Sequence, residues 1–179
     1  KFGSASFELM KNVNFSSRVI LICVLFASFG LSGCIPDPNY PIEPEIEFLS
    51  FIVDESENAV LSIHFTDGDG DLGLNQSDTL APYCSTCEHH FNLKCEYDEL
   101  RNGEWTHIPL IPAQGQVPFY YRVPRVEPSG THPALNGTIE IAMNTWYLQS
   151  EFDTLRFRMT LEDRDLNISN PDTTRLIVK

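Results

Sequence analysis

Residues 60–74 read VLSIHFTDGDGDLGL, an alternation of apolar and polar residues that runs directly into an acidic, glycine-rich turn. Leu61, Ile63 and Phe65 stand at every second position, so they lie on one face of an extended strand and leave polar residues on the other. A strand with one apolar face is typical of antiparallel sheets that pack against a core on one side. This stretch therefore predicts a β-strand followed by a tight, charged bend.

The same alternation of period two recurs along the chain. It is clearest over residues 154–162, where every second residue is apolar. Asn102 and Gly103 form the dipeptide that is typical of a tight hairpin turn. Further strands are expected over residues 45–53, 91–98, 105–108, 119–123, 138–143 and 173–178.

These strands predict an all-β domain over residues 45–179. Its expected fold is an immunoglobulin-like β-sandwich of about seven or eight antiparallel strands, with a small barrel as the alternative. In the first strand, Ile46, Phe48 and Ile52 are expected to face the core. No apolar repeat near 3.6 residues continues for three turns, so helix content should be small, with one helical turn at most over residues 147–151. The 179 residues, 42% of them hydrophobic, are enough for one core.

The segment before this domain has the composition of an export signal. Lys11 and Arg18 precede an apolar run over residues 19–29, which is too short to span a bilayer comfortably. The run is followed by Leu-Ser-Gly-Cys at residues 31–34, which resembles the lipobox where signal peptidase II of bacteria cleaves before a cysteine that receives lipid. We expect residues 1–33 to be a signal peptide, with a natural start at Met10, and Cys34 to be lipidated. An ordinary signal peptide or membrane anchor, in which the cysteine is incidental, is the alternative.

Residues 34–44 follow as a tether. Four prolines lie between positions 35 and 44, and they favour an extended, stiff segment. A lipid on Cys34 would contribute about 0.8 kcal/mol per buried methylene, so several acyl chains hold a protein firmly on a membrane. The expected location is the bacterial cell envelope, at the outer membrane, facing the periplasm or the cell surface.

The charge of the chain excludes one class of partner. The formal net charge is −13, and without the first 33 residues 9 basic and 24 acidic residues remain, a net charge of −15. Such a surface repels phosphate backbones, so no nucleic-acid partner is expected. It is compatible with cations and with basic partners.

The acidic turn supplies carboxylates from Asp67, Asp69 and Asp71, with glycines between them. Calcium takes six to eight oxygen ligands, and carboxylates at alternate positions of a curled loop can point at one centre. The similarity to an EF-hand loop ends there, because Leu72 stands where that loop needs glycine and a strand, not a helix, precedes the turn. The pattern predicts a calcium site in a β context, and a solvated Asp-Gly turn without an ion is the alternative.

A second acidic cluster follows the strand over residues 154–162. Asp163, Asp165 and Asn167 offer further oxygen ligands. In a sandwich of seven strands the second and sixth strands end at the same pole, which would bring this cluster to the first one. We therefore include the three residues in the predicted calcium site; eight full strands would place the clusters apart, and Arg164 could instead bridge to a turn carboxylate as a purely structural contact.

Three cysteines lie within the domain, at Cys84, Cys87 and Cys95. A Cys-x-x-Cys pair beside two histidines has the ligand types of a zinc site, but such a site needs about four convergent ligands and Cys95 falls on the inward face of a strand. Exported proteins more often oxidise such cysteines. One disulfide among the three, with an odd thiol, is therefore expected, and zinc or free thiols are the alternatives.

No catalytic motif is found in the sequence. The expected function is a non-enzymatic binding or structural module, with an unidentified protein or glycan partner. The alternative is a surface glycan-binding accessory lipoprotein, in which Trp105, Trp146, Tyr120 and Tyr147 stack on sugars. Aromatic residues of a sandwich are more often part of its core.

Three stretches carry a resemblance to a known group of proteins. They are Leu-Ser-Gly-Cys at 31–34, Thr-Asp-Gly-Asp-Gly-Asp-Leu-Gly at 66–73 and Asp-Arg-Asp-Leu-Asn-Ile-Ser-Asn at 163–170. Together they are similar to those of Bacteroidetes cell-envelope lipoproteins with no assigned activity. The resemblance covers most of the chain after residue 34 and implies a β-sandwich lipoprotein. The cysteine-rich stretch over residues 84–95 is not part of it.

Lipoproteins of that phylum often carry O-glycans on Asp-Ser or Asp-Thr pairs followed by an apolar residue or threonine. The pattern occurs at Thr79, Thr154 and Thr173. Only Thr79 falls in an expected loop, so the resemblance implies Thr79 as the modified residue.

Overall fold

The computed structural model describes residues 39–128 and 132–179. The predicted signal peptide, the lipidation site Cys34 and the start of the tether lie outside these residues. Among the described residues, no helix has the length and apolar character needed to span a membrane.

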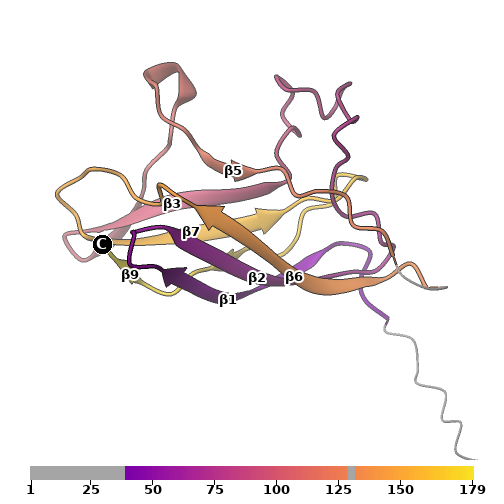
Figure 1. The fold of residues 1–179 in the computed structure, drawn as a ribbon, viewed down its shortest axis with the longest axis horizontal. Helices are drawn as coiled ribbons and strands as arrows, with labels where there is room; N and C mark the ends of the chain where they lie inside the picture. The colour runs from indigo at the N-terminus through magenta and orange to yellow at the C-terminus, as the bar shows by residue number, and fades with distance from the viewer. Residues whose placement is uncertain (1–38, 129–131) are drawn as a thin grey trace, which may run out of the picture. The chain divides into compact units, whose positions relative to one another are not determined.

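The described chain is all-β and forms two antiparallel sheets, which Figure 1 shows as two layers. One sheet has three strands in the order β1-β2-β6, and the other has the order β4-β3-β7-β8, with β5 on β3 and β9 on β7. The strands are β1 Glu45–Val53, β2 Ala59–Asp67, β3 Leu93–Arg101, β4 Glu104–His107, β5 Phe119–Tyr121, β6 Leu135–Met143, β7 Thr154–Leu161, β8 Asp172–Thr173 and β9 Ile177–Val178.

The core lies between the two sheets. Its largest buried side chains include Tyr97 of β3 and Phe157 of β7. The ring of Phe157 packs against Tyr97, Phe119 and Phe51, with ring centroids 5.7, 5.1 and 5.9 Å apart. Phe51 belongs to β1, so this aromatic cluster joins one sheet to the other.

Apart from the last one, the predicted strands are found in the structure with small differences at their ends, and so is the hairpin. Asn102 and Gly103 join β3 to β4, with Arg101 paired to Glu104 and φ of +54° and +85° at the two turn residues. These positive φ angles explain the Asn-Gly dipeptide, because both residues adopt left-handed conformations at low cost.

The predicted direction of Ile52 is wrong. The pairing of β1 with β2 shifts between Phe48 and Ser50, so Leu49 is an extra residue in β1. Because strand side chains alternate, one inserted residue moves every later side chain to the other face. Phe51 therefore packs into the core, while Ile52 is 63% exposed.

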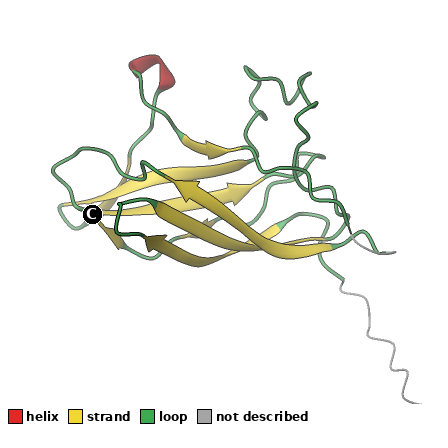
Figure 2. Cartoon of the chain, in the orientation of Figure 1, coloured by secondary structure: helices red, strands yellow, loops and turns green. Residues whose placement is uncertain are grey.

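Two other expectations also need correction. The last strand is broken, because the Thr174 hydroxyl accepts a hydrogen bond of 3.1 Å from the amide of Phe157, in place of a backbone carbonyl. The chain between β8 and β9 then leaves the ladder, and Leu176 is 61% exposed. Residues 147–151 form bends and no helical turn; the helical turn described is the 3₁₀ turn Pro112–Gln114, which Figure 2 shows on the loop between β4 and β5.

A buried ion cluster fastens β3 to β7 on the side of the sheet away from the core. Asp98 is 2% exposed and accepts hydrogen bonds from Arg156 at 3.0 Å and from Arg158 at 2.9 Å. Burial by itself raises the pKa of Asp98, but the hydrogen bonds and charges of Arg158 and Arg156 outweigh it and hold this pKa below its ordinary value.

We expect Asp98→Asn to reduce the free energy of unfolding by about 2 kcal/mol near neutral pH, because the two guanidinium groups lose their shared carboxylate. A carboxylate with a lowered pKa stabilises the fold above the ordinary aspartate value of 3.8 and loses that effect as pH falls through the folded-state pKa. The difference between wild type and variant should therefore shrink towards about pH 3. Urea unfolding across this pH range measures it, with the exposed Asp153→Asn as control; a pH-independent difference would contradict the assignment.

Candidate metal centre

Two acidic loops that are distant in the sequence meet at one pole of the sandwich. Asp67 is the last residue of β2, and Asp163 follows the end of β7 by two positions. Carboxylate oxygens of Asp67, Asp71 and Asp163 lie within 4.8 Å of one another. The two loops therefore share one cluster of oxygen atoms.

Glycines allow the first loop to curl around this cluster. Gly70 and Gly73 have φ angles of +73° and +88°, a left-handed backbone conformation that residues with a Cβ rarely adopt. A Cβ on Gly70 would also collide with the carbonyl oxygen of Pro133, and one on Gly73 with that of Pro124. Neighbouring backbone thus approaches the turn closely on two sides.

Apolar anchors hold the same turn in place. Leu72 is fully buried and Leu74 is 3% exposed. The carbonyl of Leu72 accepts a hydrogen bond of 3.2 Å from Val126, and the amide of Leu74 donates one of 3.0 Å to Val123. Packing and backbone pairing therefore hold the end of the turn, at Leu72 and Leu74, against residues 123–126.

Asp67 is fully buried, with a relative exposure of 0%. Its Oδ2 accepts a hydrogen bond of 3.2 Å from the amide of Leu72, whereas its Oδ1 has no partner among the described residues. The buried Oδ1 atoms of Asp69 and Asp71 also have no hydrogen-bond partner among the described residues. Buried carboxylate oxygens without a donor are costly, so these three atoms favour a positively charged ligand beside them.

The second loop orients Asp163. The amide of Asn167 donates to Asp163 Oδ1 and its side-chain nitrogen donates to Oδ2, both at 2.8 Å. The amide of Asp165 donates a 3.0 Å hydrogen bond to Asp71 Oδ2 and so links the two loops directly. Leu166, between them, takes a φ of +68°, which lets the loop turn back sharply.

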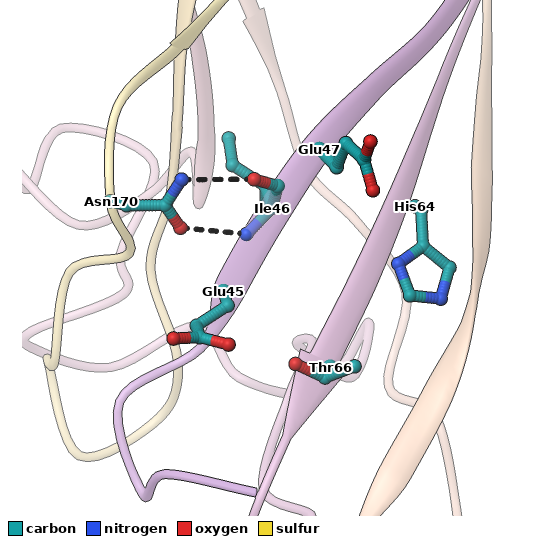
Figure 3. A pocket seen from close by; sticks show the side chains of 6 residues that line it. All are labelled: Glu45, Ile46, Glu47, His64, Thr66 and Asn170. Atoms are coloured by element: carbon teal, nitrogen blue, oxygen red, sulfur yellow. Dashed lines mark hydrogen bonds between the residues drawn. The ribbon is translucent and has the colours of Figure 1, made fainter.

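The second loop is in turn attached to the edge of β1, as Figure 3 shows. The side chain of Asn170 pairs with the backbone of Ile46 twice, accepting from its amide and donating to its carbonyl at 2.9 Å each. The Asp172 carboxylate accepts a further hydrogen bond from the amide of Phe48. The shallow hollow in that view lies beside these contacts and is lined by Glu45, Ile46, Glu47, His64, Thr66 and Asn170.

The crowded carboxylates resist ionisation. Burial, followed by the charges of Asp69, Asp71 and Asp163, raises the pKa of Asp67 to about 6. Burial and the charge of Asp163 raise the pKa of Asp71, and burial raises that of Asp163 despite the hydrogen bonds from Asn167. A divalent cation would relieve both the desolvation and the repulsion.

The donor set consists of oxygen atoms, the ligands that calcium and magnesium prefer. Of the six residues predicted for the site, Asp67, Asp71 and Asp163 converge, and Asp69 lies close enough for its charge to act on all three. Asp165 is exposed and reaches the cluster through its backbone amide, while Asn167 supports Asp163. Sequence reasoning missed the support from Asn170 and Asp172, which alternation patterns do not show.

Arg164 does not bridge to the turn carboxylates but pairs with Asp78 in the long connection between β2 and β3. Arg122 organises the same connection, because its guanidinium donates 2.9 Å hydrogen bonds to the carbonyls of Asn75, Asp78 and His90. Thr79, the expected glycosylation site, is exposed there.

Two cysteines of the same connection are joined to each other. Cys84 and Cys87 form a disulfide with a Cα–Cα distance of 4.9 Å. Cys95 is a free, buried thiol on β3, and burial raises its pKa. The three cysteines of the described residues thus form one disulfide and leave one thiol, and the Cys-x-x-Cys pair is not arranged as a zinc site.

The four aromatic candidates for sugar contact are not on one surface. Trp146 is 3% exposed in the core and donates to the carbonyl of Glu57, whereas Trp105 lies under the guanidinium of Arg156. Tyr120 and Tyr147 line one hollow between the sheets.

Comparison with known protein families, with curated proteins and with solved structures finds no match to this chain.

Proposed function

We propose that this chain is a non-enzymatic cell-envelope lipoprotein whose β-sandwich is a binding or structural module stiffened by one calcium ion. The ion is held by Asp67, Asp71 and Asp163, with Asp69 in its immediate surroundings. By joining the turn after β2 to the loop after β7, the ion fixes these two loops to each other at one pole of the sandwich.

The observation that carries this proposal is the buried, unpartnered Oδ1 of Asp67. A surface cluster of aspartates can be satisfied by water, but Asp67 is 0% exposed and faces two further carboxylates. A buried carboxylate without a donor destabilises a fold, because it loses its hydration and is repelled by the neighbouring carboxylates. A bound cation removes both penalties, which accounts for the arrangement.

Calcium is favoured over other cations by the chemistry of the donors. The converging ligands are carboxylates, without nitrogen or sulfur, which argues against zinc. Magnesium demands near-ideal octahedral geometry and retains its water, whereas calcium accepts irregular, crowded carboxylate sites. An envelope protein meets calcium outside the cytoplasm, where modules of this kind bind it with Kd values of about 10⁻⁴ to 10⁻³ M.

The finer features of the proposal are an immunoglobulin-like topology and a lipid anchor at Cys34. The strand orders β1-β2-β6 and β4-β3-β7-β8 support the former, since they correspond to the A-B-E and C′-C-F-G orders of such sandwiches. The lipobox-like residues 31–34 support the latter. The anchor places the module at the outer membrane of a bacterial envelope.

Calorimetric titration of the full chain with calcium chloride tests the proposed ion. We expect one binding event per chain, which Asp163→Asn weakens at least about tenfold, because it removes a charged ligand supplied by the second loop. The exposed Asp153→Asn is the matched control and should bind as wild type does. Equal affinities for the two variants, or no heat of binding at all, would refute the shared site.

A further inference from the structure

No described strand pairs with the outer edge of β6. All nine residues of β6 pair with β2 on one side. Within residues 39–128 and 132–179, no other backbone hydrogen bond involves Leu135–Met143. The amide and carbonyl of every second residue of the strand therefore point away from the sheet, with no backbone partner in the described part of the chain.

The other edges are treated differently. On β1, the side chain of Asn170 hydrogen-bonds to the backbone of Ile46 (Figure 3). The Asp172 carboxylate accepts from the amide of Phe48, and the extra residue Leu49 interrupts the register of the strand. At the borders of the larger sheet, β4, β5, β8 and β9 are two to four residues long. Short strands, bulges and side-chain caps are the usual protection against pairing with another chain.

Strand β6 has neither the short length nor the bulge that protects the other edges, because it is nine residues long and its register with β2 has no shift. Its sequence, LNGTIEIAM, also lacks proline and lysine, the residues that commonly block an edge strand. Its single charge is the exposed Glu140. Among the strands described here, β6 is thus the long, flat and unprotected edge.

A hollow of about 610 Å³ lies beside the end of this edge. Ala142 and Met143 of β6 form one wall, and the segment from Val117 to Tyr121 at β5 forms the other, with Tyr147 and Leu148 at the end. Val117 is 80% exposed although it is apolar. The hollow therefore opens between the two sheets on the side where β6 has no neighbour.

We propose that β6 is a docking edge for an extended segment of a partner protein, which adds to the sheet as a further antiparallel strand. Apolar side chains at alternate positions of that segment fill the hollow beside Met143, and the intervening positions meet Glu140 on the outer face. Because this acidic chain favours positive charge, those positions are lysine or arginine.

A second copy of the chain is a poorer occupant. Two copies would bring together two molecules of net charge −13. In a two-fold pairing of β6 with itself, the Glu140 side chains of both copies would lie close together on one face, which is destabilising. The inference concerns β6 and the hollow only, and it does not depend on the ion site.

Four synthetic peptides of the form Lys-X-Lys-X-Lys-X-Lys, with X valine, isoleucine, phenylalanine or tyrosine, test the proposal on the full chain. We expect at least one to saturate below about 1 mM and to slow hydrogen exchange of the β6 amides. Glu140→Lys should weaken that peptide about fivefold, because it replaces attraction by repulsion at the edge. The control Glu47→Lys makes the same charge change on the exposed face of β1 and should leave the affinity within about twofold.

Backbone methylation of the best peptide separates strand addition from simple charge attraction. Only one edge of a docked strand faces β6, so N-methylation of one alternate set of amides should abolish binding and methylation of the other set should leave it within about twofold. Equal effects of the two patterns, equal weakening by both charge variants, or no saturation by any peptide would overturn the proposal. The proposal would also be overturned if neutral oligosaccharides slowed hydrogen exchange of the Tyr120 and Tyr147 amides while no peptide slowed that of the β6 amides. That result would favour a sugar in the hollow.

Discussion

Calcium at about 10 mM will raise the melting temperature of the wild-type chain by about 5–10 °C, and Asp67→Asn will remove that increase. A ligand present at about 100 times its Kd stabilises the folded state by about 2.7 kcal/mol, which corresponds to several degrees in a domain of this size. Asparagine lacks the charge that holds the ion but keeps the size of the side chain. The loss of response would therefore reflect binding and not a collapsed turn.

Without calcium the same substitution should act in the opposite direction. Wild-type Asp67 is a fully buried carboxylate close to Asp71 and Asp163, and burial with these charges raises its pKa to about 6. Asparagine removes the repulsion and can still accept the hydrogen bond from Leu72. We expect the variant to melt above wild type in EDTA and below it in calcium.

Thermal melting of both proteins in EDTA and in calcium, followed by circular dichroism, measures this crossing. The exposed Asp153→Asn should follow wild type in both conditions. A variant that melts below wild type in EDTA would show that the Asp67 carboxylate stabilises the fold by itself. That result would remove the reason for placing an ion beside it.

Gly70→Ala will reduce the free energy of unfolding by more than about 3 kcal/mol and will abolish the calcium response. Two effects combine at this position. The left-handed φ of +73° costs alanine about 1–2 kcal/mol, and the added Cβ meets the carbonyl oxygen of Pro133, so the backbone has to move. That movement displaces Asp69 and Asp71, which flank the glycine.

Gly103→Ala provides a matched control for this prediction. Gly103 has a φ of +85°, but nothing lies within 4 Å of the position of its missing Cβ. The same substitution there carries the conformational cost alone, about 1–2 kcal/mol, and leaves calcium binding unchanged. Urea unfolding and calcium titration of both variants give the comparison; equal losses of stability, or an unchanged calcium response in Gly70→Ala, would contradict the close packing around the turn.

Much of the sheet structure could be predicted from alternation alone. The polar face of β2 is largely buried as well, with Ser62 8% exposed, which alternation does not predict. Alternate apolar residues of β2 and β7 do point into the core, so Leu61 and Phe157 could be assigned to it from the sequence. The bulge at Leu49 could not, because an inserted residue changes the register without changing the composition of the strand. The break at Thr174 depends on a hydroxyl that replaces a backbone acceptor, and such a contact requires coordinates.

The candidate site was predictable in its members more than in their roles. Aspartates after two strands offered oxygen ligands, and strand parity allowed them to meet, but only the fold places Asp67 and Asp163 in one cluster. Asn167 was expected as a ligand by its residue type, yet its side-chain nitrogen donates to Asp163. Such differences arise because a loop residue can face the ion or support a neighbour, and short-range sequence patterns do not separate the two.

A crystal structure of the protein grown with calcium, with anomalous diffraction to locate the ion, tests the central claim most directly. We predict one calcium ion per chain with oxygen atoms of Asp67, Asp71 and Asp163 at about 2.3–2.6 Å. Calcium found only on exposed carboxylates elsewhere, or the three aspartates turned apart with water between them, would contradict it.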